Sequence, residues 1–309
     1  MVCFENLKKS YGHTAALCGV DGSVSKGELF GIIGPDGAGK TTLLRILATL
    51  IMSDSGVATV DGLDVVRDCK RIRTRIGYMP GRFSLYHDLT VEENLTFFAS
   101  VFGTSIRENY HLIADIYRHI EPFRNRRAGQ LSGGMKQKLA LSCALIHKPS
   151  ALLLDEPTTG VDPVSRRELW EMLRRLKEQG ITILVSTPYM DEATRCDRIA
   201  LIRNGQFLKT DTPAHIAGQF GKTLWAVSGE RMATLLADLR RCRGVLTCFA
   251  FGSTHHITVD AGLLTVESLR QQLIGQGHTH IEIQPVTATV EDCFMELAAG
   301  KTENPESRI

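Results

Sequence analysis

The fold of this chain is decided by one stretch, Gly34-Pro35-Asp36-Gly37-Ala38-Gly39-Lys40-Thr41-Thr42. It follows a short apolar run at 29–33 and precedes a helical pattern at 43–50. Its glycines let backbone N–H groups close around phosphate oxygens, and the start of a helix adds partial positive charge. In this pattern Lys40 bridges the β- and γ-phosphates of a nucleotide, and Thr41 binds Mg²⁺. The stretch therefore predicts a nucleotide site; a glycine-rich turn without a ligand is the alternative.

A second apolar run, 151–154, ends in two acids, Asp155 and Glu156. Downstream of a phosphate-binding loop, this pattern is typical of a strand whose first carboxylate binds Mg²⁺ through water. The second carboxylate, Glu156, is then placed to polarise the attacking water as the catalytic base. The alternative is a buried strand that runs into an acidic loop.

Apolar runs alternate with helical patterns through the first two-thirds of the chain. The runs typical of buried strands are 29–33, 75–79, 151–154 and 181–185. This alternation predicts an α/β fold with a mainly parallel sheet covered by helices. Together with the glycine-rich loop at 34–42, it predicts a P-loop NTPase fold. Capping boxes at Thr90 and Ser105 predict two consecutive helices, and hence a helical insertion at about 88–147.

The pattern changes near residues 218–222, beyond which the elements follow the order βαββαβ. We expect an ATP-binding domain over 1–220, a small α+β accessory domain over 222–299 and a disordered polar tail over 300–309. The accessory domain contains four histidines with no carboxylate placed to orient them, which predicts surface or strand-face histidines without a catalytic role. These are His255, His256, His278 and His280.

The composition excludes several classes of protein. The 309 residues contain 36 Lys and Arg against 34 Asp and Glu, so bulk positive charge cannot drive binding, and no nucleic-acid partner is expected. The eight cysteines form no C-x-x-C pair, which argues against a zinc site or a disulfide framework. No apolar run is long enough to cross a bilayer, and the first residues lack the apolar core of a signal peptide.

A third motif lies shortly before Asp155: Leu131-Ser132-Gly133-Gly134-Met135-Lys136-Gln137. With this motif the chain resembles the ATP-binding cassette (ABC) ATPases over residues 1 to about 220. The resemblance implies that Ser132, Gly133 and Gly134 form the signature that grips the γ-phosphate of an ATP held by the opposite cassette. A serine-glycine helix cap is the alternative.

The resemblance extends to further positions. It implies that Tyr11 stacks on adenine and that Asp162 belongs to the D-loop, which links the two ATP sites. Within the family the chain is most similar to the ATPases of bacterial ABC-2-type multidrug exporters. Their last helix carries Leu/Val-Glu-Asp-x-Phe, matched here by 289–294, Thr-Val-Glu-Asp-Cys-Phe. An amphipathic helix covering the small sheet would explain the same residues.

The resemblance also implies cofactors, partners and a location. ATP and Mg²⁺ are the expected cofactors, and the expected activity is ATP hydrolysis. A separate transmembrane permease and a second cassette are the expected partners. The chain itself is expected to be cytoplasmic and peripheral at the inner face of the cell membrane.

Two positions depart from the family pattern. The glutamine that usually follows Tyr-x-Pro is replaced by Gly81, and the switch histidine is replaced by Pro188. Proline can neither share a proton nor donate a hydrogen bond to a γ-phosphate. We therefore expect MgATP binding to survive better than hydrolysis, and a heterodimer to be favoured over a homodimer. Arg82 and His87 are the nearest residues that could substitute for the missing groups.

Three functions are consistent with these residues. The first is the ATPase subunit of an ABC-2-type exporter, which couples ATP-driven cassette dimerisation to a separate permease. The second is a catalytically impaired, regulatory cassette of a heterodimer. The third is a soluble ABC protein that acts on ribosomes or DNA. The third is disfavoured because the chain has one cassette, no long coiled coil and almost no net charge.

Overall fold

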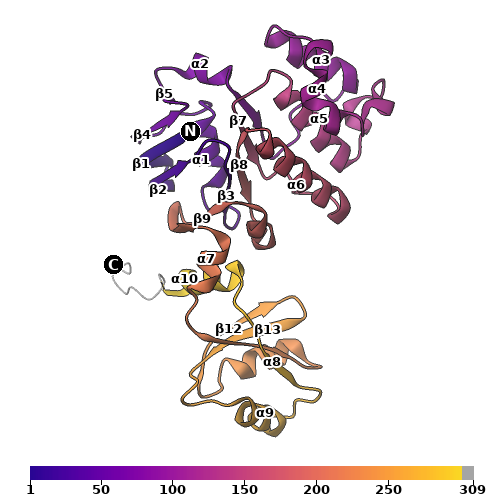
Figure 1. The fold of residues 1–309 in the computed structure, drawn as a ribbon. Coiled ribbons are helices and arrows are strands. Elements are labelled where there is room, and N and C mark those ends of the chain that lie inside the picture. Colours follow the sequence, from indigo (N-terminus) through magenta and orange to yellow (C-terminus); the bar gives the residue numbers. More distant parts are fainter. Residues whose placement is uncertain (301–309) are drawn as a thin grey trace. The chain divides into compact units, whose positions relative to one another are not determined.

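The computed structural model describes residues 1–300, and the chain divides into two compact units (Figure 1). The first unit is Met1–Pro213 and the second begins at Ala214. The predicted disordered tail lies almost wholly at 301–309, outside the described residues. That the chain forms separate domains with a boundary at 220–222 stays a prediction. Within 1–300, no helix combines the length and apolar character needed to cross a membrane.

The first unit is built around a six-stranded sheet of order β10-β9-β3-β8-β7-β6. Its strands are β3 (Leu29–Ile33), β6 (Ile76–Met79), β7 (Ala151–Asp155), β8 (Thr182–Thr187), β9 (Arg198–Arg203) and β10 (Gln206–Asp211). All neighbours are parallel except the β9–β10 hairpin, so the predicted α/β fold is confirmed. The parallel strands share one carboxyl edge, where ligands bind in open α/β sheets.

A second, antiparallel sheet of order β2-β1-β4-β5 was not predicted from the sequence. Its strands are β1 (Val2–Tyr11), β2 (Thr14–Val24), β4 (Ser55–Val60) and β5 (Leu63–Asp64). Its buried side chains, such as Phe4 and Leu7, share one hydrophobic core with Leu43 and Leu47 of α1 (Lys40–Leu47). This sheet therefore fixes the position of the helix that begins at Lys40.

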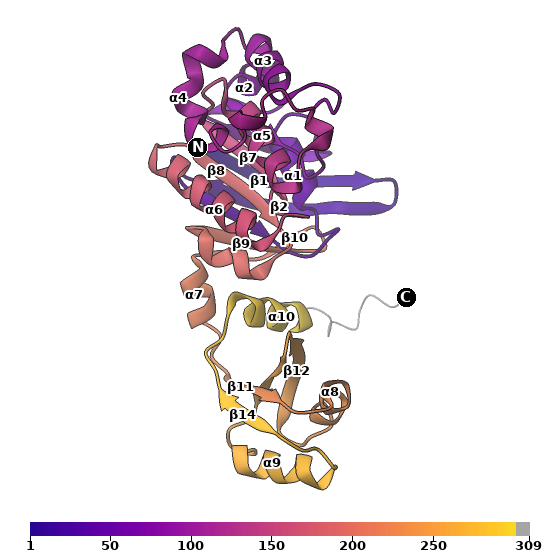
Figure 2. The ribbon, with the colours of Figure 1, turned by 90° about the vertical axis from the view of Figure 1, so that its right-hand side faces the viewer.

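Helices cover the parallel sheet and form a separate group at one side of the unit. Figure 2 shows α1 and α6 (Pro163–Glu178) beside β7 and β8. The separate group is α3 (Val91–Val101), α4 (Ile106–Tyr117) and α5 (Gly133–Leu145) (Figure 1). Both predicted capping boxes are present, at Thr90 with Glu93 and at Ser105 with Glu108. The shorter elements are α2 (Cys69–Arg73), η1 (Glu121–Phe123), η2 (Ala128–Gln130), η3 (Met190–Arg195) and α7 (Pro213–Gly218).

The second unit has the predicted βαββαβ order. Its elements are β11 (Thr223–Ser228), α8 (Met232–Leu239), β12 (Val245–Phe251), β13 (Thr254–Val259), α9 (Val266–Gly275) and β14 (Glu282–Pro285), followed by α10 (Val290–Gly300). The strands form an antiparallel sheet of order β12-β13-β11-β14. Leu235 of α8 and Leu269 of α9 share a core with Ile257 of β13, so both helices pack on one face of this sheet.

Helix α10 is held to the other face of the sheet by a buried carboxylate. Asp292 is 4% exposed and accepts hydrogen bonds from the backbone N–H and the hydroxyl of Thr289, at 2.8 and 2.7 Å. Its other oxygen lies 2.7 Å from Nδ1 of His256. Since His256 and Ile257 are neighbours on a strand, they point to opposite faces. Asp292, the third residue of α10, thus caps the start of this helix and fixes it to β13.

The expectation that no carboxylate orients the histidines of this unit is wrong. Besides His256, Nε2 of His278 lies 2.9 Å from Asp238 Oδ2, and Nε2 of His280 lies 3.3 Å from Glu230 Oε1. The fourth, His255, lies with Nε2 2.7 Å from the carbonyl oxygen of Met232. Each acid is far from its histidine in the sequence, and the sheet brings them together.

Candidate nucleotide-binding site

The loop 34–39 connects β3 to α1 and can be made only with glycine at both ends. A Cβ atom at Gly34 would lie 2.1 Å from the carbonyl oxygen of Ile202, and one at Gly39 would lie 2.3 Å from that of Ala16. Gly39 also has a φ of 106°, in the region that side chains rarely adopt. The close packing of the loop between two carbonyl groups keeps its backbone N–H groups at the start of α1.

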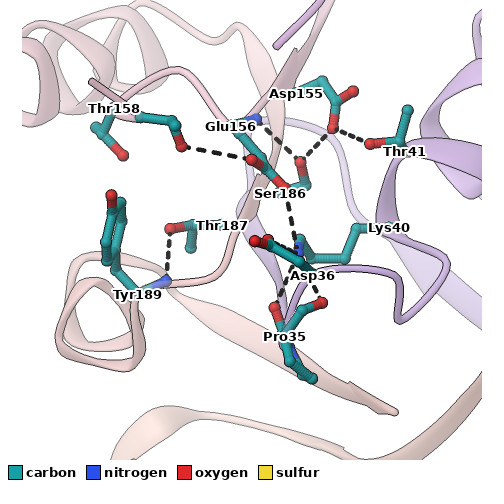
Figure 3. A network of polar contacts seen from close by, with 12 residues as sticks. Pro35, Asp36, Lys40, Thr41, Asp155, Glu156, Thr158, Ser186, Thr187 and Tyr189 are labelled. Carbon is teal, nitrogen blue, oxygen red and sulfur yellow. Dashed lines mark hydrogen bonds and ion pairs between the residues drawn. The ribbon is translucent and has the colours of Figure 1, made fainter. Parts of the chain in front are cut away.

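Lys40 is buried in this loop and surrounded by oxygens. Its side chain is 3% exposed, and Nζ donates to the carbonyl oxygens of Gly34 and Pro35, at 2.8 and 3.0 Å (Figure 3). Nζ also lies 3.2 Å from Oε1 of Glu156 and 3.9 Å from Oδ1 of Asp36. An arriving phosphate would compete for the same ammonium group, and contacts between charged groups are the stronger ones.

Thr41 and Asp155 meet at the carboxyl edge of β7. The hydroxyl of Thr41 donates to Oδ1 of Asp155 at 3.0 Å, and the hydroxyl of Ser186 donates to the same oxygen at 2.6 Å (Figure 3). Mg²⁺ prefers oxygen ligands, and it commonly takes one or two from the protein and the rest from water and phosphates. The hydroxyl and carboxylate oxygens present here fit that preference.

Glu156 has a strained backbone at the end of β7. Its φ is 48°, which costs about 1–3 kcal/mol for a residue with a side chain. Its backbone N–H donates to the carbonyl oxygen and the hydroxyl of Ser186, at 3.1 and 3.0 Å, which holds this conformation in place. The carboxylate is thereby directed toward Lys40, and Thr159 donates to it at 3.4 Å.

The structure places both altered positions beside these residues. A Cβ atom at Gly81 would lie 3.2 Å from the carbonyl oxygen of Asp155 and 3.7 Å from Cβ of Glu156. Pro188 directly follows Thr187, whose carbonyl oxygen accepts from the N–H of Gly34 at 3.3 Å. Neither Gly81 nor Pro188 carries a polar side chain. At these two positions the loops that follow β6 and β8 therefore present only backbone polar groups to the site.

Neither suggested substitute contacts the carboxylates. The ring of His87 packs edge-on against Phe83, with ring centroids 5.1 Å apart, and its carbonyl oxygen accepts from the N–H of Gly129. Arg82 is exposed. Across residues 1–300, neither side chain forms a hydrogen bond or ion pair with Asp155 or Glu156.

The residues predicted to form the signature and the D-loop lie together at the starts of α5 and α6. The hydroxyl of Ser132 accepts from the N–H of Met135 at 3.3 Å, so it caps α5. Ser132 and Gly133 are exposed, whereas Gly134 is buried. A Cβ atom at Gly134 would lie 2.6 Å from the hydroxyl oxygen of Ser165, on α6. Only glycine therefore allows the two helix starts to approach this closely.

Asp162 caps α6 with its carboxylate. Oδ1 accepts from the N–H groups of Val164 and Ser165, at 3.1 and 3.0 Å. The hydrogen bond from the N–H of Ser165 is the main reason that the pKa of Asp162 lies below its ordinary value. Tyr11, at the end of β1, is 48% exposed, and Nζ of Lys9 lies over its ring, 5.8 Å from the centroid.

Sequence reasoning missed two residues that organise the site. Ser186 joins Asp155 to the backbone of Glu156, as described above. Glu192 of η3 is 3% exposed and accepts from the hydroxyls of Thr158 and Thr187, which follow β7 and end β8. Hydroxyl residues at the end of an otherwise apolar strand, Ser186-Thr187, were the available signal.

The chain is similar to a known protein family and to several individual proteins. The family model described as ABC transporter matches residues 17–159. The probable multidrug ABC transporter ATP-binding protein YbhF of Escherichia coli (strain K12) is 39% identical over 95% of this chain and 51% of its own length. The Nod factor export ATP-binding protein I of Burkholderia lata is 35% identical, over 97% and 98%. This chain therefore spans about half of the first relative and nearly all of the second.

The chain also matches solved structures. One is the dimeric structure of a post-hydrolysis state of the ATP-binding cassette MJ0796, bound to ADP and Pi. It has a TM-score of 0.63 and 28% identity, and the match covers 69% of this chain and 98% of that one.

Proposed function

The chain belongs to the family of ABC transporter ATP-binding proteins, and we propose that it is the ATPase subunit of an ABC-2-type exporter with a separate permease. One observation supports this most directly. Lys40, Thr41, Asp155 and Glu156, which the sequence places in two motifs, meet at one edge of the parallel sheet. The names of the relatives point to export as the process that ATP drives.

Different residues at this edge would bind the nucleotide and promote its hydrolysis. The loop N–H groups and Lys40 would bind the phosphates, and Tyr11 would stack on the base. Thr41 and Asp155 would hold Mg²⁺, which offsets phosphate charge when bound. Phosphate binding would release Glu156 from Lys40, and the freed carboxylate could then polarise a water molecule.

A second cassette would complete the site. Ser132 and Gly133 are exposed at the start of α5, where N–H groups can bind an anion. Within residues 1–300 they form no hydrogen bond with the chain's own 34–42 loop. We propose that they contact ATP held by another cassette, and that Asp162 lies at the same interface. In a heteromeric pair, this intact signature would face the ATP site of a partner cassette that retains the glutamine and the histidine.

An apolar cleft in the first unit supports docking of a permease. It has a volume of about 270 Å³ and lies between the end of β6 and helices α3 and α5. Phe98, Phe102, Tyr78 and Leu85 line it, and His147 stacks on Phe102 at 3.8 Å. Burial lowers the pKa of His147, so the cleft carries a neutral imidazole at neutral pH. An apolar segment of a membrane protein fits such a surface, which would hold this chain at the inner face of the membrane.

The proposal is tested by purifying the tagged chain from membranes of its host. We expect a polytopic membrane protein to co-purify, and Phe98→Ser to reduce its yield severalfold. Phe123→Ser is the matched control, because Phe123 is also half-buried but lies outside the cleft. Equal recovery with both variants, or recovery of ribosomes instead, would contradict the proposal.

The loss of polar groups at Gly81 and Pro188 favours a second role, a regulatory cassette that binds ATP and rarely hydrolyses it. The two roles differ in turnover. If ATP is hydrolysed only when a partner cassette is added, the chain is an exporter ATPase subunit that depends on that partner. A chain that stays inactive in the assembled pair, while ATP binding at its own site controls the partner, serves the second.

A further inference from the structure

A pocket of about 350 Å³ lies in the first unit at the amino edge of the parallel sheet. Strands β3, β7 and β8 run parallel, so their starts lie together at this edge, and the nucleotide residues lie at the other one. The volume is within the range of about 300–1,000 Å³ that is typical of small-molecule sites. None of the residues that line this pocket belongs to the nucleotide site.

The floor of the pocket is apolar. It is formed by Leu112 of α4, Leu145 at the end of α5, and Pro149 and Ile181, which lie just before β7 and β8. Leu145 and Pro149 are buried, whereas Leu112 and Ile181 are only half-buried. Apolar surface therefore remains accessible at the floor, and a hydrocarbon group could cover it.

The polar side chains at the rim are hydrogen-bond donors, and two of them are cations. Lys26, Lys148 and Gln179 line the pocket, and all three residues are exposed. Within residues 1–300 neither ammonium group and no atom of the Gln179 amide group forms a hydrogen bond or ion pair. No carboxylate is among the described residues of the lining. The rim thus offers positive charge that the described part of the chain does not neutralise.

Hydrogen bonds between the segments hold the pocket in shape. Thr182, the first residue of β8, is fully buried and joins two of the segments. Its hydroxyl oxygen accepts from the N–H of Gly27 at 3.0 Å, and its own N–H donates to the carbonyl oxygen of Ser150 at 3.2 Å. On the helical side, Nδ2 of Asn109 in α4 donates to the carbonyl oxygen of Ile146, after α5, at 2.7 Å. A ligand would therefore meet a largely preformed site.

A ligand for this pocket must combine an apolar body with an acceptor group of negative charge. We propose that the pocket binds a small amphiphilic anion, which has one charged head group on a hydrocarbon chain. The chain packs on Leu112, Leu145 and Ile181, and the head group faces Lys26 and Lys148. A small polar anion would leave the floor uncovered, and a neutral amphiphile would leave the lysines unpaired. The inference does not depend on the proposed transport role.

The test uses decanoate as the probe, at concentrations below those at which it forms micelles. In the full chain with labelled isoleucine methyl groups, the variant Ile181→Val identifies the NMR signal of Ile181. We expect decanoate to shift this signal saturably. The signal of Ile274, which is 58% exposed on α9 in the second unit, should not move and reports non-specific binding. Acetate, decanol and decyltrimethylammonium should each bind at Ile181 at least tenfold more weakly than decanoate.

Variants of the rim separate the charge from the apolar floor. Lys26→Gln combined with Lys148→Gln should weaken decanoate binding by about tenfold, since each exposed ion pair contributes modestly. Lys70→Gln, an exposed lysine outside the pocket, is the matched control and should bind normally. The proposal is overturned if Ile181 does not respond, if Ile274 responds equally, if decanol binds as tightly as decanoate, or if the double variant binds like the wild type.

Discussion

The candidate nucleotide site, at the carboxyl edge of the parallel sheet, has two halves that differ in their polar side chains. The first half, the 34–42 loop with Asp155, joins each polar group to another: Lys40 to three oxygens within 3.2 Å and Thr41 to Asp155. The second half, the loops after β6 and β8, presents Gly81 and Pro188 beside Asp155 and Gly34. We propose that the first half holds phosphates; at Gly81 and Pro188 the second half carries no polar side chain that could position water.

This difference separates two properties that usually occur together. Binding depends on charges and N–H groups that are all present, whereas turnover also depends on groups that handle or position a proton. Loss of such a group typically lowers the rate by about 10²–10⁴. A chain can therefore keep its affinity for MgATP and still hydrolyse it slowly.

The largest expected effect disables the first half. Lys40→Ala removes a charge-assisted contact worth about 1.5–3 kcal/mol, which predicts MgATP affinity at least tenfold weaker by calorimetry. Lys70→Ala, an exposed lysine on α2, is the control and should bind normally. Equal affinities for all three proteins would remove Lys40 from the site.

A packing change tests the contact between the starts of α5 and α6. Gly134→Ala places a methyl group 2.6 Å from the hydroxyl oxygen of Ser165, and overpacking of this kind costs about 1–3 kcal/mol. We expect a lower free energy of unfolding in urea, partly restored by adding Ser165→Gly. No destabilisation in the single variant would mean that the starts of α5 and α6 can move apart freely.

Ser186, on β8, binds both the Asp155 carboxylate and the backbone of Glu156, and its removal should have a smaller effect. Ser186→Ala takes a hydrogen bond from the Asp155 carboxylate and another from the N–H of Glu156. We expect unfolding to become easier by about 1–2 kcal/mol, and turnover to fall more than MgATP affinity. Ser142→Ala, a buried serine bonded to a carbonyl oxygen in α5, should lower stability without that selective loss of turnover.

The smallest effect concerns Asp162 and depends on pH. Because its pKa is lowered in the folded chain, its carboxylate stabilises the fold above the ordinary value of 3.8. That contribution is lost as the pH falls through the lowered pKa. The melting temperatures of wild type and Asp162→Ala should thus differ slightly at pH 7 and converge in acid. A constant difference down to low pH would assign the effect to something other than this charge.

Much of this arrangement was predictable from local sequence. The glycine loop, the acids after 151–154 and both capping boxes each lie within a few residues of what they organise. The hairpin at Asn204-Gly205 was likewise predictable, and both residues have positive φ values, of 49° and 71°. The functional roles assigned to the residues of these motifs stay predictions.

What could not be predicted depends on contacts between distant segments. The pairs His256–Asp292 and His278–Asp238 join residues 36 and 40 positions apart. The β1–β2–β4–β5 sheet pairs strands whose alternation is interrupted by register shifts, at Leu7 among others. The left-handed backbone of Glu156 follows from hydrogen bonds to Ser186, on another strand. In each case tertiary contacts, not local pattern, decide the outcome.

The central claim is that this chain binds MgATP well and hydrolyses it slowly because of Gly81 and Pro188. The direct measurement is single-turnover hydrolysis by the purified chain at saturating MgATP, compared with the double variant Gly81→Gln and Pro188→His. The added glutamine must be accommodated 3.2 Å from the carbonyl oxygen of Asp155, so Pro188→His alone serves as the second comparison. We predict slow hydrolysis by the wild type and a gain of about 10² or more in the double variant. Brisk hydrolysis by the wild type, with no gain in either variant, would contradict the account.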